Sequence, residues 1–323
     1  MMLRVAGPYP PVEPYDSGLL QAADGLTVYW ETIGNSCGTP AVYLHGGPGS
    51  GSTRTARCLF DPAVFRAVLF DQRGCGRSRP LVSETGADLT TNTTALLVAD
   101  LERLREHLGI DRWVVVGVSW GVTLGLVYAQ RFPERVTAMV LAGVTSGTRR
   151  ETDWITRSMG RIFPAEWDRF VSLLPPEDRG GDPAAGYARL LADTDPAVRE
   201  RAAQQWCTWE DTHVSLMPGW SPNPRYDDPE FRMVFARLVT HYWSHGCFLT
   251  DDQIRSQMDQ LTGIPAVLVH GRYDVSAPLD TAWHLHRAWP DSQLVILDEA
   301  GHGGIGFDNA ISDAVDSFRS TGQ

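Results

Sequence analysis

The sequence has a deficit of positive charge and lacks any long apolar run. It contains 28 lysines and arginines against 39 aspartates and glutamates, which gives a formal net charge of −11. A phosphate backbone binds a positive surface, so this balance argues against nucleic acid as a partner. No apolar run approaches the roughly 18 residues of a membrane helix, and no signal-peptide pattern is present. We therefore expect a cytoplasmic protein without a membrane partner.

Cysteine is scarce and carries no pattern typical of a disulfide framework or a metal site. The five cysteines are scattered, odd in number and without a C-x-x-C pair. Such a distribution is typical of reduced thiols. Cys75 lies in a glycine-rich loop, where it is either an accessible thiol or a small filler residue, and we expect a filler. The sequence thus predicts neither a metal ion nor an organic cofactor.

What is present is a globular composition, 43% hydrophobic and 21% charged, in a chain of 323 residues. Leucines at spacings of four, three and four mark one stripe of a helix that ends near Gly109. Apolar runs predict strands at residues 26–33, 41–44, 67–70, 113–116 and 136–141. Because strands alternate with helices, we predict an α/β fold with a mostly parallel central sheet flanked by helices.

This alternation stops after the fifth predicted strand and resumes at Ile264. The intervening segment is mostly helical in pattern and contains six of the eleven tryptophans. We interpret residues 144–255 as a helical cap inserted into a sheet domain. The two parts of that sheet domain are then residues 1–143 and 256–323.

A serine stands between glycines at the point where a strand pattern becomes a helix pattern. Gly117-Val118-Ser119-Trp120-Gly121 is a G-x-S-x-G motif in that context. The glycines permit a tight, strained turn that exposes the Ser119 hydroxyl at the carboxyl edge of the sheet. A free serine is a poor nucleophile at neutral pH, so it requires a base and a residue that orients the base. The alternative is a serine without a catalytic role in a glycine-rich turn.

The partners of such a serine are expected after later strands, in the order acid and then histidine. Asp274 follows the strand pattern at 266–269, and His302 follows the one at 293–297. We predict that Asp274 orients His302, which acts as the base.

Two other aspartates and two other histidines compete for these roles. Asp280 lies beyond a turn proline, and Asp298 is too near His302 along the chain. His45 and His270 are interpreted as loop or core residues.

The oxyanion of a tetrahedral intermediate needs hydrogen-bond donors. The sequence His45-Gly46-Gly47-Pro48-Gly49 follows an early strand, and its glycines allow backbone amides to approach a ligand closely. We expect one donor to be the amide of Trp120 and the other that of Gly47, with Gly46 as the alternative. A phosphate-binding role is disfavoured, because neither G-x-x-x-x-G-K-[ST] nor G-x-G-x-x-G is in place at this loop.

Together these motifs resemble the proline iminopeptidases, or prolyl aminopeptidases, of the α/β-hydrolase fold. The motifs are H-G-G-P-G (45–49), D-Q-R-G-C-G-R-S (71–78), G-V-S-W-G (117–121), H-G-R-Y-D (270–274) and A-G-H-G (300–303). The resemblance extends from about Tyr15 to the C-terminal helix and includes cap segments. It implies a triad of Ser119, Asp274 and His302 that acts through an acyl-enzyme.

Members of this family remove an N-terminal residue, typically proline, and hold its amine with acidic side chains of the cap. The match to W-x-x-W-E implies that Glu210 is one such acid. Where the family usually reads E-N-H-Y-F, this chain has Val239-Thr-His-Tyr-Trp243, so a second acid is missing. The substrate is then a short peptide or small molecule with a free amino terminus, and a bulky aminoacylated product is an alternative to a peptide.

Two further functions stay open. An esterase or C–C bond hydrolase would use the same triad but has no use for Glu210. A ligand receptor would keep the fold and bind without turnover. A dehalogenase or epoxide hydrolase is disfavoured, because both need a carboxylate where Ser119 stands.

Overall fold

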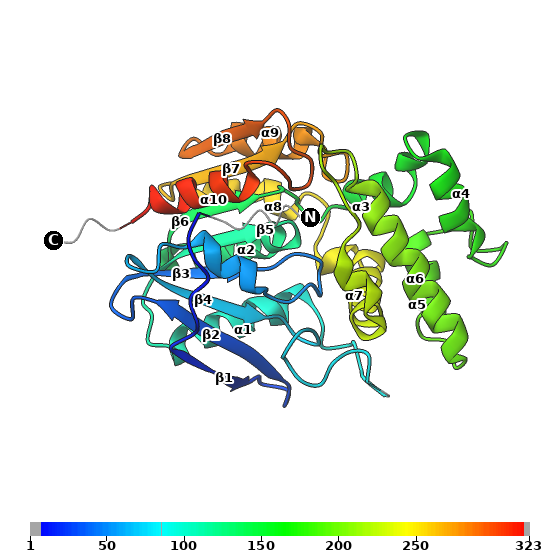
Figure 1. Cartoon of the computed structure of the whole chain (residues 1–323), viewed down its shortest axis with the longest axis horizontal. Helices are drawn as coiled ribbons and strands as arrows, with labels where there is room; N and C mark the ends of the chain where they lie inside the picture. Colours follow the sequence, from blue (N-terminus) through cyan, green and yellow to red (C-terminus); the bar gives the residue numbers. More distant parts are fainter. Residues whose placement is uncertain (1–7, 85, 320–323) are drawn as a thin grey trace.

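A computed structural model describes residues 8–84 and 86–319, so residues 1–7, 85 and 320–323 of the predicted domains lie outside the described residues. The chain forms one eight-stranded sheet with the order β1-β2-β4-β3-β5-β6-β7-β8 (Figure 1). The strands are β1 (Asp16–Gln21), β2 (Thr27–Gly34), β3 (Thr39–Leu44), β4 (Phe65–Asp71), β5 (Trp113–Val118), β6 (Val136–Ala142), β7 (Ala266–Gly271) and β8 (Ser292–Leu297).

Most of this sheet is parallel, as predicted. The β2 strand pairs antiparallel with both β1 and β4, whereas all pairs from β4 to β8 are parallel. The parallel strands must therefore be connected by crossovers, and their carboxyl ends meet at one edge of the sheet. Loops that follow different strands can meet at that edge.

Helices cover both faces of the sheet because the central strands are apolar on both sides. In β5, Trp113 and Val115 pack into one hydrophobic cluster, and Val114 and Val116 pack into another on the opposite face. The first cluster lies under α1 (Thr94–His107), α2 (Trp120–Arg131) and α9 (Leu279–Ala288). The second lies under η1 (Arg54–Leu59) and α10 (Phe307–Asp316).

The predicted helical insertion lies between β6 and β7, beside the sheet domain (Figure 1). Its elements are α3 (Arg149–Thr156), η3 (Ser158–Arg161), α4 (Pro164–Ser172), α5 (Pro183–Leu190), α6 (Pro196–His213), η4 (Pro224–Asp227), α7 (Pro229–Ser244) and η5 (Gly246–Phe248). The aromatic rings of Phe170, Tyr187, Trp206 and Trp209 form the centre of a separate hydrophobic core in this cap. The cap therefore has its own internal packing.

Three cap helices start in the same way. Asp182, Asp195 and Asp228 each precede a proline at the first helical position and accept hydrogen bonds from backbone amides of the first turn. An aspartate cap satisfies amides that have no partner within the helix, and the following proline has no amide to satisfy. The sequence pattern Asp-Pro thus sets where α5, α6 and α7 begin.

The cap boundaries at 143/144 and 255/256 stay a prediction. Val144 packs into the hydrophobic cluster of the sheet domain, and so does Ile254 in α8 (Gln253–Ser256). The η6 helix (Met258–Leu261) follows and contacts the same cluster. Within residues 8–84 and 86–319, no helix is long and apolar enough to cross a lipid bilayer.

Candidate active site

Ser119 occupies the sharp turn between β5 and α2. Its backbone has φ 55° and ψ −121°, a conformation that costs a residue with a side chain on the order of 1–3 kcal/mol. The turn is held by hydrogen bonds from Ser119 N to Ala142 O at 2.9 Å and from Val122 N to Ser119 O at 2.7 Å. Surrounding backbone thus fixes the strained geometry that the motif predicts.

The glycines on either side of Ser119 are required by close backbone contacts. A Cβ atom at Gly117 would lie 2.4 Å from Gly121 O, and one at Gly121 would lie 2.0 Å from Leu44 O. Neither position has space for a side chain. The start of α2 can therefore pack directly on β3 and present Ser119 above the sheet edge.

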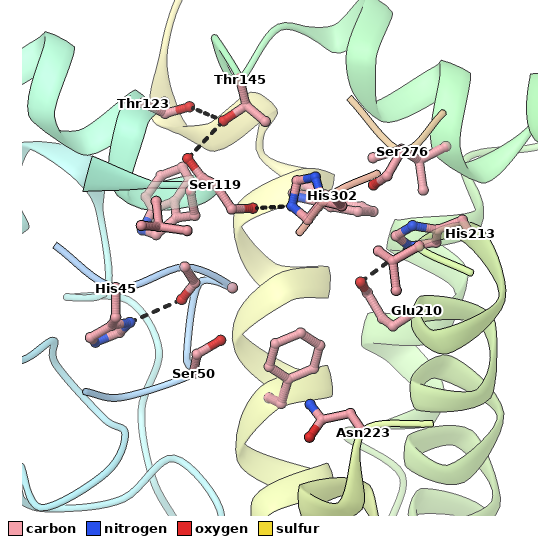
Figure 2. Close-up of a pocket in the computed structure, with 18 of the residues that line it drawn as sticks. His45, Ser50, Ser119, Thr123, Thr145, Glu210, His213, Asn223, Ser276 and His302 are labelled. Atoms are coloured by element: carbon pink, nitrogen blue, oxygen red, sulfur yellow. Dashed lines mark hydrogen bonds and ion pairs between the residues drawn. The ribbon is translucent and has the colours of Figure 1, made fainter. Parts of the chain in front are cut away.

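The three side chains predicted from the sequence as a catalytic triad are connected by hydrogen bonds. His302 Nε2 lies 2.9 Å from Ser119 Oγ (Figure 2). His302 Nδ1 lies 2.8 Å from Asp274 Oδ2. The second carboxylate oxygen of Asp274 accepts a hydrogen bond from Ala277 N at 2.8 Å. With the proton on Nδ1 donated to Asp274, the Nε2 lone pair of His302 faces the serine hydroxyl.

The acid and the histidine stabilise each other's charged forms. Burial alone would raise the pKa of Asp274. The charge of His302 and its hydrogen bond outweigh this effect and hold the pKa of the carboxyl below its ordinary value. Burial alone would lower the pKa of His302, but the Asp274 carboxylate outweighs it and the pKa is raised above 6.5. The arrangement therefore favours an ionised carboxylate and a histidine that can accept a proton.

Asp280 and Asp298, the other two candidates for the acid, are not part of this hydrogen-bonded triad. Asp280 pairs with Arg150, and Asp298 pairs with Arg272 at 2.8 Å. Neither forms a hydrogen bond with His302 among the described residues. The preference for Asp274 as the partner of His302 agrees with this geometry.

The two competing histidines are buried and bonded to the backbone. His45 accepts a hydrogen bond from Gln72 N at 3.0 Å and donates to Gly46 O at 2.9 Å, and burial lowers the pKa of its imidazole to about 4. His270 likewise bonds to backbone atoms through both ring nitrogens. Their interpretation as loop or core residues is confirmed. Cys75 is fully buried, which confirms that it is a filler.

Backbone amides close to Ser119 are free to bind an oxyanion. A Cβ atom at Gly46 would lie 3.7 Å from Ser119 Oγ, so this loop passes directly beside the hydroxyl. In the described part of the chain, the amides of Gly46, Gly47 and Trp120 donate no hydrogen bond. Free amides at these positions fit an oxyanion site, and the assignment of Trp120 and Gly47, or Gly46, stays a prediction.

A cavity of about 330 Å³ lies between Ser119 and the cap. The sheet domain contributes the 45–53 loop, Ser119 and His302, and the cap contributes side chains that include Glu210, Phe235 and Trp243. Of the cap tryptophans, Trp243 lines the cavity, while others form the cap core. No group of three or more potential metal ligands occurs in residues 8–84 and 86–319.

Glu210 points from α6 into this cavity beside His302 (Figure 2). Its Oε1 accepts a hydrogen bond from Trp206 Nε1 at 3.0 Å, and its Oε2 lies 3.1 Å from His213 Nε2. The Glu210 side chain is 12% exposed. Its charge is one of the effects that raise the pKa of His302, so the carboxylate acts electrostatically on the histidine.

Comparison with known proteins establishes the family. The model of the alpha/beta hydrolase fold family matches residues 39–308. A probable proline iminopeptidase of Streptomyces coelicolor is 52% identical over 319 residues, which cover 97% of this chain and 98% of the relative. A proline iminopeptidase of Xylella fastidiosa is 44% identical over 314 residues, 96% of this chain and 98% of the relative. The chain belongs to the proline iminopeptidase family of α/β-hydrolases.

The family predicted from the motifs is thus confirmed, and with it the prediction of a hydrolase. A crystal structure of a proline iminopeptidase from Mycobacterium smegmatis superposes with a TM-score of 0.59 at 22% identity. The superposition covers 89% of this chain and 91% of that chain. At this identity the likeness supports the fold, an α/β-hydrolase sheet with a helical insertion.

The position at which proline iminopeptidases usually carry a second acid has a structural role in this chain. Val239 is completely buried in the cap core, beside Phe235 and Ala236. It does not line the cavity.

Sequence reasoning missed several other polar groups on the cavity wall, among them Glu151, Asp211 and His213. Glu151 accepts hydrogen bonds from Ser146 N and other groups at the start of α3, where it forms a capping box with the N-cap residue Thr148. Asp211 accepts a hydrogen bond from Asn223 N at 3.0 Å, and burial raises its pKa despite that bond. His213 also lines the cavity, and its spacing of three from Glu210 on a helix is the signal that could have identified it.

Proposed function

We propose that this hydrolase is a serine aminopeptidase that releases an N-terminal residue, with proline as the first candidate, from a short peptide in the cytoplasm. One observation carries the proposal: Ser119 and His302, which is hydrogen-bonded to Asp274, line the same cavity as the Glu210 carboxylate. The names of the two relatives, a probable proline iminopeptidase and a proline iminopeptidase, support the choice of proline.

The first half of the reaction forms an acyl-enzyme. The Ser119 hydroxyl attacks the carbonyl carbon of the N-terminal residue while His302 Nε2 takes the hydroxyl proton. Negative charge then develops on the carbonyl oxygen, where the amides of Trp120 and Gly47 or Gly46 can donate to it. When the tetrahedral intermediate collapses, the imidazolium of His302 gives its proton to the departing amine.

The second half of the reaction restores the enzyme. Water attacks the acyl carbon, His302 accepts its proton, and collapse returns that proton to Ser119 Oγ as the free amino acid is released. Asp274 holds the imidazole in the correct tautomer and stabilises its charged form throughout. All bonds made and broken are accounted for by substrate, water and these side chains.

Glu210 supplies the specificity for an amino terminus. An ammonium group beside the carboxylate forms a charge-assisted hydrogen bond, whereas an internal peptide nitrogen would leave the carboxylate unpaired. A cavity of about 330 Å³ fits a small N-terminal residue near the reacting serine. An esterase would gain nothing from this carboxylate.

The test compares prolyl arylamide, N-acetylprolyl arylamide and a simple aryl ester on wild-type enzyme and the Glu210→Gln variant. We expect wild type to prefer the free amine. We also expect Glu210→Gln to lower kcat/KM for that substrate on the order of 10²-fold and to leave the ester unchanged. Glu166→Gln, which removes an exposed cap carboxylate paired with Arg169, is the matched control.

The same measurements distinguish the aminopeptidase from the alternative functions. If acetylation of the amine makes no difference to wild type, the role of Glu210 is wrong. Preferred turnover of the ester would favour an esterase. Failure of a fluorophosphonate to label Ser119, together with no turnover of any substrate, would favour a receptor.

A further inference from the structure

His213 is a buried imidazole on the cavity wall whose ring nitrogens have no hydrogen-bond partner among the described residues. It is 2% exposed, and it lies one helical turn after Glu210 at the end of α6. Its ring makes an edge-to-face contact with Trp209, with 6.1 Å between the ring centroids. Burial without a partner is costly for a polar nitrogen, so such a group in a native structure calls for an explanation.

The second observation is the distance between His213 and Glu210. His213 Nε2 lies 3.1 Å from Glu210 Oε2 (Figure 2), but neither ring nitrogen forms a hydrogen bond with any described residue. Two acceptor atoms at this separation can both be reached by one ammonium nitrogen with ordinary hydrogen-bond lengths of about 2.9 Å. The cavity thus offers a pair of acceptors at the point where the proposed function puts the substrate amine.

We propose that neutral His213 is a second acceptor for the ammonium group of the substrate, beside Glu210. With its proton on Nδ1, the imidazole presents the Nε2 lone pair to one N–H while the carboxylate accepts from another. The inference rests on the proposed aminopeptidase function, because it assigns a partner to the same amine. It also adds a condition on the substrate, which must carry at least two N–H bonds on its terminal nitrogen.

Charge balance favours the neutral form of His213 in this role. Glu210 alone provides one negative charge for the one positive charge of the ammonium. A protonated His213 would instead pair with Glu210 and neutralise the carboxylate before substrate arrives. The two protonation states predict opposite effects when the imidazole is removed. If His213 is neutral, the enzyme loses affinity for the substrate amine, and if it is protonated, the enzyme gains affinity.

N-terminal proline makes a sharp probe because its ammonium has two N–H bonds, and N-methylproline has one. The experiment measures kcat and KM for prolyl and N-methylprolyl arylamides with wild type, His213→Leu and His213→Gln. We expect His213→Leu to raise KM for the prolyl substrate about tenfold with little change in kcat. KM for the N-methylprolyl substrate should barely change. Glutamine keeps a neutral acceptor, so His213→Gln should stay within about threefold of wild type.

Control measurements separate this role from a structural one. His245→Leu removes an exposed cap histidine and should leave both KM values unchanged. The rate of Ser119 labelling by a fluorophosphonate reports whether the reacting serine is intact in each variant.

Two results would overturn the inference. A lower KM for the prolyl substrate in His213→Leu would mean that His213 competes with the substrate for Glu210. An equal rise in KM for both substrates would mean that the side chain only supports the fold. Both results leave the aminopeptidase function standing, whereas wild-type indifference to N-acetylation would refute that function itself.

Discussion

Gly121→Ala tests whether the contact between α2 and β3 positions Ser119, the proposed nucleophile. The added Cβ would lie 2.0 Å from Leu44 O and 2.7 Å from the carbonyl carbon. Both are backbone atoms of a buried parallel strand, so neither can rotate away. Relief of the overlap requires α2 and β3 to separate by roughly 1 Å in a closely packed core.

The magnitude follows from opposing contributions to the free energy of unfolding. Alanine favours the folded helix by up to about 1 kcal/mol through its helix propensity and the smaller entropy of the unfolded chain. Overpacking costs about 1–3 kcal/mol, and more where backbone must shift. Since both overlapping atoms belong to the backbone, we expect a cost at or above the upper end of that range and a net loss of about 2–3 kcal/mol. Because Ser119 directly precedes α2, a displacement of this size should also lower kcat/KM about 10²-fold.

The assay is urea unfolding followed by the fluorescence of the eleven tryptophans, together with kcat/KM on the prolyl arylamide. Gly180→Ala is the matched control, because a Cβ there would have no atom within 4 Å. Gly125→Ala should fall between the two, since its Cβ would meet only side-chain atoms of Val115 and Leu44 at 3.2 and 3.3 Å. If Gly121→Ala proves as stable and as active as Gly180→Ala, the close approach does not position the serine.

The remaining predictions concern the hydrogen-bonded chain at Ser119. Ser119→Ala should abolish fluorophosphonate labelling and lower the rate at least about 10⁴-fold, and a variant that retains most activity would exclude Ser119 as nucleophile. Only neutral His302 can accept the serine proton, and Asp274 raises the pKa of that imidazole above 6.5, so kcat/KM should fall as pH drops through this raised value. Asp274→Asn should move that limb of the pH profile to lower pH and cost about 10⁴-fold in rate, with Asp280→Asn unchanged as the control. If the acidic limb of the pH profile does not shift in Asp274→Asn, the electrostatic coupling between Asp274 and His302 is refuted.

The part of the site that sequence could predict depends on chain connectivity. Ser119, Asp274 and His302 each follow an apolar run, and the carboxyl ends of parallel strands must meet at one edge. Their meeting point therefore follows from the alternation of strands and helices alone. The glycines around the serine also have a local cause, because no side chain fits there.

Other features depend on packing that a linear pattern does not encode. The edge strand β1 was missed because most of its residues are exposed and no apolar run marks it. The position of β4 between β2 and β3 is set by pairing between distant strands. His213 was missed because it lies on the buried side of α6, in line with Trp206 and Trp209, and periodicity marks such a residue as buried without showing that it borders a cavity.

The insertion of the cap between β6 and β7 has a consequence for biosynthesis. Ser119 leaves the ribosome before the cap, while Asp274 and His302 emerge only after it. Since nascent chains fold from the amino terminus onwards, Ser119 has neither of its proposed catalytic partners until translation is nearly finished. By then the cap helices, which carry the proposed amine-binding carboxylate, have already been synthesised. In the proposed mechanism the enzyme therefore becomes able to react only after the part that selects its substrate is present.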